Sequence, residues 1–361
     1  MFAAIVQTSV ALLIGAAGGF AFKLVHAPLP WTLGSLTAAA LVALCGGRWL
    51  VPSALRDIAR PVVGLLAGSA FTAEVMRSLL AWWPLVPATL LFSVATSAAG
   101  YLYFARFCRF DRPTAFFASF PAGLSELSLL GASLGGNIRS LALVHATRVV
   151  TVVFLIPVLL SLFADLHAAA PSPNAVPAAA PARDWVVLGL CGLFAYLVRR
   201  PTRSFGGAMI IALILSAITH GAGWTVAQPP AWLVAGVQVV IGSIVGGRIA
   251  GANRAELGRI VLLSWIWALA LIAFAALVAL AAQFVFGRPF STLLLAFAPG
   301  GMVEITLLAY AAGLEVAFVV TAQICRTIVA LLIAPHLFRL IVPPDAPGGD
   351  APNRRESSDD F

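Results

Sequence analysis

Apolar stretches long enough to cross a lipid bilayer recur along this chain from its first residues to about residue 342. Hydrophobic residues make up 61% of the 361 positions and charged residues only 10%, and the mean hydropathy is +1.00. A soluble domain is not this apolar. In lipid a backbone must satisfy its own hydrogen bonds, which leaves helices for stretches of this length. The sequence therefore predicts an all-α integral membrane protein.

Two stretches of the chain repeat each other, namely residues 121–130 (PAGLSELSLL) and residues 299–308 (PGGMVEITLL). Each stretch places a helix-breaking proline and glycine shortly before a glutamate, in apolar surroundings. The agreement continues downstream at one constant offset. The further matching pairs are Gly135 with Gly313, His145 with Gln323, Arg148 with Arg326, and Pro157 with Pro335. An ancestral duplication is the simplest explanation.

Two glycine pairs are related by the same offset. They are Gly64 with Gly68 and Gly242 with Gly246. Glycines four residues apart form a smooth helix face on which another helix backbone can approach closely. We therefore expect tight helix packing at corresponding places in the two halves.

The apolar pattern predicts twelve elements in two sets of six. The expected domains are a first membrane repeat (1–166), an Ala/Pro-rich linker (167–183), a second membrane repeat (184–342) and a disordered cytoplasmic tail (343–361). The elements cover roughly 3–22, 30–46, 58–73, 80–105, 114–133 and 139–163, and then 185–198, 205–220, 231–247, 260–286, 290–312 and 316–341.

The basic residues indicate how these elements cross the bacterial inner membrane, because Lys and Arg gather on its cytoplasmic side. Twelve plain crossings would divide them almost evenly between the two sides. They fall mostly on one side, with both termini cytoplasmic, if the fifth element of each set enters the membrane and turns back. The helix-breaking residues of those elements are Pro121, Gly123, Pro299 and Gly301.

An odd number of crossings in each half would invert one repeat relative to the other. The sequence therefore predicts a multi-pass protein with two inverted six-element repeats, about ten crossing helices and two Pro/Gly-broken re-entrant elements. An alternative remains open in which the short third element, from Pro61 to Ala73, is the irregular one.

Four ionisable residues are expected deep in the membrane: Glu126, Glu304, Arg148 and Arg326. A charge near the bilayer centre costs at least about 2.5–3.5 kcal/mol, so it persists only if it is paired or faces water. One interpretation is a structural Glu–Arg pair in each half. The other is a transport site, because secondary carriers bring discontinuous helices from two inverted repeats together at the midplane.

In the transport interpretation the two glutamates couple to protons or cations, while the arginines and nearby polar groups line a cavity. The predicted substrate- or ion-binding residues are Glu126, Glu304, Arg148, Arg326, His145, Gln323, Ser128 and Thr306. For His145 an interior, hydrogen-bonding role remains the alternative. The charge of the substrate stays open, since two glutamates and two arginines are formally neutral together.

At these residues the chain resembles the bacterial AbrB-type membrane protein family with an internal duplication, which also carries AmoA-like and ammonia monooxygenase labels. The resemblance rests on the motif Pro-[Ala/Gly]-Gly-x-x-Glu-[Leu/Ile]-[Ser/Thr]-Leu-Leu and the arginine helix that follows it. The labels imply gene regulation or ammonia oxidation. The histidines lie in different elements without metal-ligand spacing, which argues against an oxygenase. Short loops offer no folded basic surface for DNA.

The sequence thus predicts an ion- or proton-coupled secondary transporter of a small solute. The alternative is a membrane-bound regulator or sensor that affects gene expression indirectly. We expect no enzymatic activity, no cofactor and no metal ion. The expected partners are a small-molecule or ion substrate and the lipid bilayer, with a homodimer as the candidate assembly and no direct nucleic acid binding.

The predicted topology can be tested with reporter fusions. Fusions after Arg112 and after Arg203 should both report the cytoplasm, because only two crossings, by the elements at 139–163 and 185–198, separate these positions when the fifth element turns back. Opposite locations for the two reporters would contradict the inverted repeat and favour twelve plain crossings.

Overall fold

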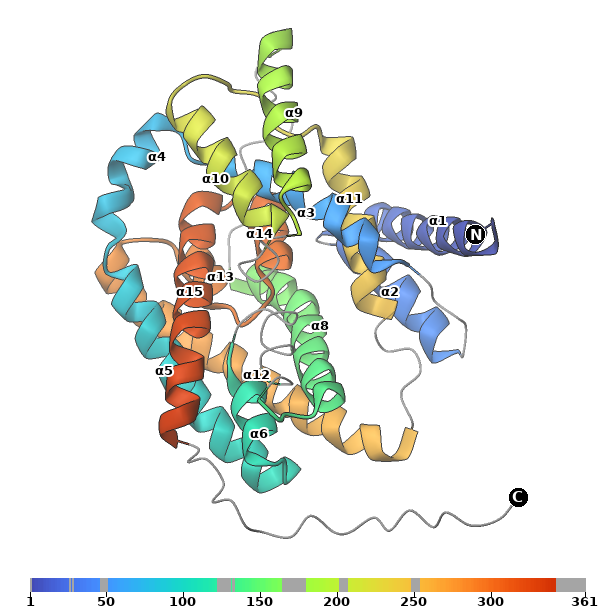
Figure 1. Cartoon of the computed structure of the whole chain (residues 1–361), viewed down its shortest axis with the longest axis vertical. Coiled ribbons are helices and arrows are strands. Elements are labelled where there is room, and N and C mark those ends of the chain that lie inside the picture. The colour runs from blue at the N-terminus through green and yellow to red at the C-terminus, as the bar shows by residue number, and fades with distance from the viewer. Residues whose placement is uncertain are drawn as a thin grey trace.

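The computed structural model describes residues 2–25, 27, 29–45, 51–121, 131, 134–163, 180–200, 207–247 and 254–341. All regular elements in these ranges are helices (Figure 1). Most of the expected linker and the whole of the expected tail lie outside the described residues, so their predicted character stays a prediction.

Most helices overlap the predicted elements, although α3 (Ser53–Gly68) begins and ends five residues earlier than the element predicted at 58–73. In the first half they are α1 (Phe2–Leu24), α2 (Pro30–Leu44), α3 (Ser53–Gly68), α4 (Ala73–Ser78), η1 (Leu79–Trp82), α5 (Leu85–Tyr103), η2 (Phe104–Cys108), α6 (Arg112–Ser119) and α8 (Ile138–Phe163). In the second half they are α9 (Ala182–Leu197), α10 (Ala208–Gly221), α11 (Ala231–Gly247), α12 (Arg254–Phe286), α13 (Phe290–Phe297), α14 (Met302–Ala311) and α15 (Val316–Ile341). The element predicted at 290–312 is therefore two helices with a break between them.

Several helices are long and apolar enough to cross a membrane. Within the described ranges there are five: Val6–Leu24, Leu85–Cys108, Ile138–Leu162, Gly258–Phe286 and Val316–Ala334. A sixth candidate is α3 together with the helical segment Ala73–Trp82, which is bent from it by 76°. The apolar helices α2, α10, α11 and α14 have only 10–17 residues. The chain is thus a helical membrane protein, and the ten crossing helices of the prediction are not confirmed by the spans found in the described ranges.

The shorter helices are explained by where they pack. A helix of 15 residues is about 22 Å long, which is less than the hydrocarbon thickness of about 30 Å. These helices pack on other helices of the protein, with α2 on α11, α10 on α3 and α14 on α15. Their apolar composition therefore reflects burial in protein as well as contact with lipid.

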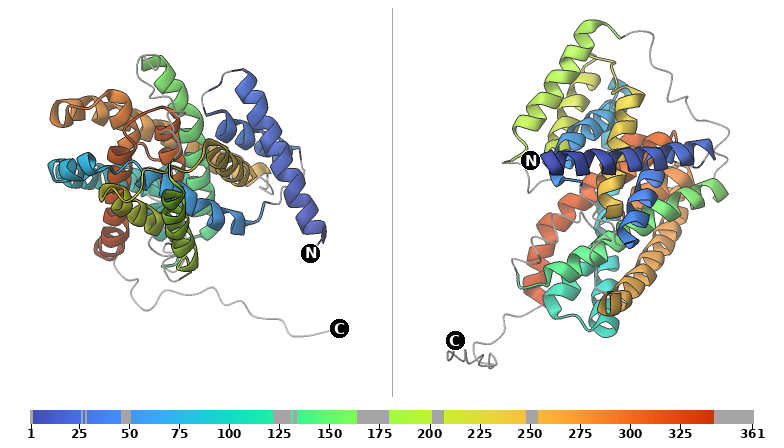
Figure 2. Two further views of the ribbon diagram at one scale, coloured as in Figure 1. Left: turned by 90° about the horizontal axis from the view of Figure 1, so that it is seen from above. Right: turned by 90° about the vertical axis from the view of Figure 1, so that its right-hand side faces the viewer.

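Helices of one half pack on helices of the other half, and the largest of these contacts occur twice with the roles of the halves reversed. Helix α2 packs on α11 and α10 packs on α3, while α5 packs on α15 and α12 packs on α8. Corresponding helices also have matching bounds, since both ends of α13 (290–297) lie 178 residues after those of α6 (112–119). The bounds of α15 (316–341) follow those of α8 (138–163) by the same 178 residues. The duplicated sequence folds as two similar units that interlock, with α1 at the outer edge (Figure 2).

The interlocking depends on the glycine pairs. A Cβ atom on Gly64 would lie 2.8 Å from the Ala212 Cβ atom on α10, and one on Gly246 would lie 2.8 Å from the Ala39 Cβ atom on α2. The other glycine of each pair also meets backbone atoms of the same partner helix. The predicted close approach is confirmed at both pairs.

A leucine at Gly246 should destabilise the protein, because the α2 backbone leaves no space for a side chain. We expect a loss of about 3 kcal/mol or more, at or above the upper end of overpacking effects. Gly236 is the matched control on the same helix, since a Cβ atom there has no neighbour within 4 Å. Thermal unfolding of the purified variants measures the difference. Equal midpoints for Gly246→Leu and Gly236→Leu would contradict the packing.

Candidate functional site

The break between α13 and α14 is set by a proline. A residue that precedes proline avoids the helical conformation, and Ala298, which precedes Pro299, is extended with φ −56° and ψ 131°. Helix α14 begins three residues later, after Gly301, which is also extended (φ −76°, ψ 145°). Carbonyl groups at the end of α13 consequently lose their partners in the helix.

Side chains from α15 bind these carbonyl groups. Arg326 donates hydrogen bonds to the carbonyl oxygens of Ala298 (2.5 Å) and Gly300 (3.0 Å). Gln323, one turn earlier, donates to the carbonyl oxygen of Leu295 (3.0 Å) and accepts a hydrogen bond from Arg326. Both side chains are buried. Two residues that the sequence assigns to a cavity wall therefore cap a broken helix.

The first half contains the same contact. Arg148 on α8 donates to the carbonyl oxygen of Phe120 at 2.7 Å, and Phe120 precedes Pro121 and is extended (φ −67°, ψ 130°). In each half the arginine follows the residue before the proline by 28 positions. The repeated Pro…Arg spacing in the sequence thus encodes a repeated guanidinium–carbonyl bond.

The two arginines lie near each other in the interior. Each is 2% exposed, and they are close enough for their charges to act on each other. Helix α14 contacts both α8 and α15, and it lies near the middle of the molecule (Figure 1). Each guanidinium group sits at the C-terminal end of a short helix, where the helix dipole favours a positive charge.

Glu304 lies in the first turn of α14 and is partly exposed. Its carboxylate folds back over Gly301, since a Cβ atom on Gly301 would lie 3.1 Å from the carboxyl carbon of Glu304. A glutamate three residues after the N-cap is typical of the helix start, where the dipole favours a negative charge.

The Glu304–Arg326 ion pair expected in the structural interpretation is wrong. Within the described ranges the ion pair observed is Arg288–Glu315, and Arg326 instead binds carbonyl oxygens released by the break. The corresponding pair in the first half cannot be compared, because Glu126, Gly123 and Ser128 lie outside the described residues.

Comparisons with known proteins cover most of the chain. The family model described as "Transition state regulatory protein AbrB" matches residues 31–342. The chain belongs to this family. It is 26% identical over 351 residues to the uncharacterized protein YhjN of Bacillus subtilis (strain 168), with 91% of each chain covered. It is 24% identical over 331 residues to "Putative regulator AbrB" of Escherichia coli (strain K12), with 89% of this chain and 92% of the relative covered.

Two further predicted site residues of this AbrB-family chain are buried. The Thr306 hydroxyl donates to the carbonyl oxygen of Met302 at 2.7 Å, a hydrogen bond within its own helix. His145 is fully buried one turn before Arg148. Neither ring nitrogen of His145 has a hydrogen-bond partner of normal geometry among the described residues, although the Phe117 backbone lies near the ring. The imidazole therefore differs from Gln323, its counterpart, whose amide is fully engaged.

The sequence reasoning missed the carbonyl acceptors at Phe120, Ala298 and Gly300. A backbone acceptor has no side-chain pattern of its own. The signal that points to two of them is their position directly before a proline, where the helix has to end.

A double-mutant cycle should show whether Arg326 acts on backbone carbonyl groups together with Gln323 or forms an ion pair with Glu304. Arg326→Ala is expected to reduce the free energy of unfolding by about 3 kcal/mol or more, because it strands buried carbonyl groups. Combining it with Gln323→Ala should cost less than the sum of the single changes, since the two side chains act together. Combining it with Glu304→Ala should be additive. A large coupling energy between Arg326 and Glu304 in denaturant unfolding would contradict this arrangement.

Proposed function

We propose that this AbrB-family protein is a secondary transporter of a small solute, coupled to an ion or a proton. The observation that carries the proposal is the break at residues 298–301, which places the N-terminus of α14 among buried helices with Glu304 in its first turn. Discontinuous helices of this kind form substrate and ion sites in inverted-repeat carriers.

Glu304 is suited to a coupling role by its surroundings. It is partly exposed, and it forms no ion pair with another described side chain. A proton or cation can therefore bind and leave without breaking a salt bridge to Arg326. Glu126 occupies the matching position of the first repeat, and we propose the same role for it.

The proposed topology has two inverted repeats, with both termini on the cytoplasmic side of the inner membrane. The exchanged packing supports it, because α2 on α11 and α10 on α3 are the contacts that a two-fold relation between the halves produces. If that axis lies in the membrane plane, the two Pro/Gly breaks enter from opposite faces. They would then meet near the midplane, as the transport mechanism requires.

A second candidate function is a membrane regulator or sensor without transport. It is favoured by the family description and by the name of the Escherichia coli relative, both of which refer to regulation. In that case the broken helices bind a ligand and change the packing of α14, and any effect on gene expression is indirect. Neither candidate involves enzymatic chemistry.

Uptake into proteoliposomes tests the transport proposal. The purified full-length protein is supplied with small organic anions and amino acids under an imposed proton or sodium gradient. Glu304→Gln should abolish gradient-driven uptake while the protein still folds, because glutamine also serves at this position of a helix start. Glu315→Gln is the matched control, since Glu315 pairs with Arg288 at the protein surface and should transport normally.

The outcomes separate the two functions. Ligand binding without uptake in any gradient would favour the sensor. Normal coupled uptake by Glu304→Gln would contradict the coupling role of this carboxylate while leaving transport itself supported.

A further inference from the structure

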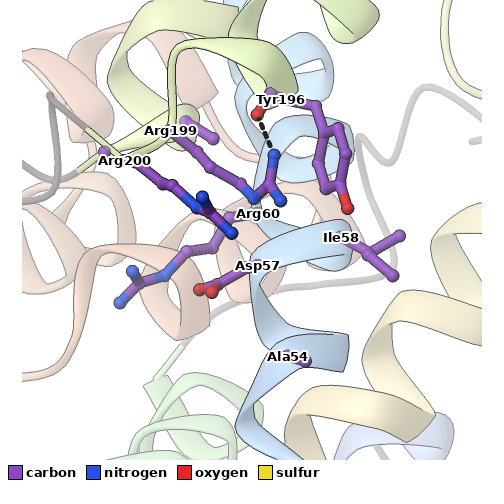
Figure 3. A pocket seen from close by; sticks show the side chains of 9 residues that line it. Ala54, Asp57, Ile58, Arg60, Tyr196, Arg199 and Arg200 are labelled. Carbon is purple, nitrogen blue, oxygen red and sulfur yellow. Dashed lines mark hydrogen bonds between the residues drawn. The ribbon is translucent and has the colours of Figure 1, made fainter.

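A pocket of about 300 Å³ lies away from the broken helices, where the start of α3 meets the end of α9 (Figure 3). Asp57 and Arg60 line it from α3, and Tyr196, Arg199 and Arg200 line it from the end of α9. Its volume is at the lower end of the range for small-molecule sites, which is about 300–1,000 Å³. The pocket is therefore large enough for a small polar group.

The lining carries an excess of positive charge. Three arginines face one carboxylate, that of Asp57. The guanidinium group of Arg199 stacks on the Tyr196 ring at 3.8 Å and donates to the Tyr196 carbonyl oxygen at 2.7 Å. This holds the group in place while most of its five N–H donors stay available for another acceptor. Arg200 is exposed and can reach a ligand from solvent.

The start of α10 adds to this charge. Gly207, the N-cap residue, lines the pocket and has φ 61° and ψ −143°, a conformation that residues with a side chain rarely adopt. No side chain caps the helix at this position. The positive end of the α10 dipole therefore faces the pocket without a competing carboxylate or hydroxyl at the N-cap.

We propose that this pocket binds a phosphate group, held chiefly by Arg60, Arg199 and Arg200. Planar guanidinium groups recognise phosphate oxygens in pairs, which suits three arginines around one small pocket. Arg60 belongs to the first repeat and the other two to the second, so a bound phosphate bridges the halves. The site is separate from Glu304 and does not depend on whether the protein transports a solute.

Two kinds of molecule carry a phosphate group that fits this pocket. One is the headgroup of an anionic phospholipid and the other is a dissolved phosphate. The topology proposed above places the pocket at the cytoplasmic surface, where it is accessible to both.

The experiment measures thermal unfolding of the full-length protein in phosphatidylcholine nanodiscs. One arm titrates inorganic phosphate against chloride at equal ionic strength, and the other replaces part of the lipid with phosphatidylglycerol. The wild type should be stabilised in a saturable way in at least one arm. Arg200→Gln should weaken that binding about tenfold, the effect of one lost charge-assisted hydrogen bond. Asp57→Asn should strengthen it, because it removes the negative charge from the pocket.

Arg77→Gln is the matched control, because Arg77 is an exposed arginine on α4 outside the pocket. Stabilisation that Arg200→Gln weakens and Arg77→Gln retains supports the site. If it occurs only with phosphatidylglycerol, the source is a lipid headgroup, and if only with inorganic phosphate, the source is a dissolved phosphate. No stabilisation in either arm, or equal weakening by Arg200→Gln and Arg77→Gln, would overturn the proposal.

Discussion

The interior of this protein depends on a guanidinium group bound to the carbonyl that a proline has released from a helix. Pro299 forces Ala298 out of the helical conformation, and an unpaired carbonyl in the interior would cost several kcal/mol. Arg326 satisfies it, and Arg148 does the same for Phe120 in the other half. The buried charge is tolerated because the break supplies acceptors, and the break is tolerated because the charge supplies donors.

This interaction also creates the feature on which the proposed function rests. Ending α13 early allows a second helix, α14, to begin in the interior, and its first turn carries Glu304. The glycine pairs contribute from a distance, because they let α3 and α11 approach α10 and α2 closely enough for the halves to interlock. The interlocked halves then bring α8 and α15, the helices that carry the two arginines, into contact with α14.

Much of the site could be anticipated from the residues, but the pairing of its charges could not. The spacing of Glu304 and Arg326 suggested an ion pair, since both are charges in an apolar half. The structure shows that Arg326 binds the backbone instead, and backbone acceptors do not appear in a pattern of side chains. Likewise Arg60, Arg199 and Arg200 served in the sequence only as markers of topology, whereas folding gathers them around one pocket.

By itself the sequence determined the membrane class, the duplication, the glycine faces and the positions at which the helices break. These features follow from local rules for proline, glycine and apolar length, which act within a few residues of the chain. Tertiary structure alone decided that each half packs on the helices of the other, that the arginines cap carbonyl groups, and that α3 meets the end of α9. Such contacts join residues far apart in the chain, so they depend on how whole helices pack.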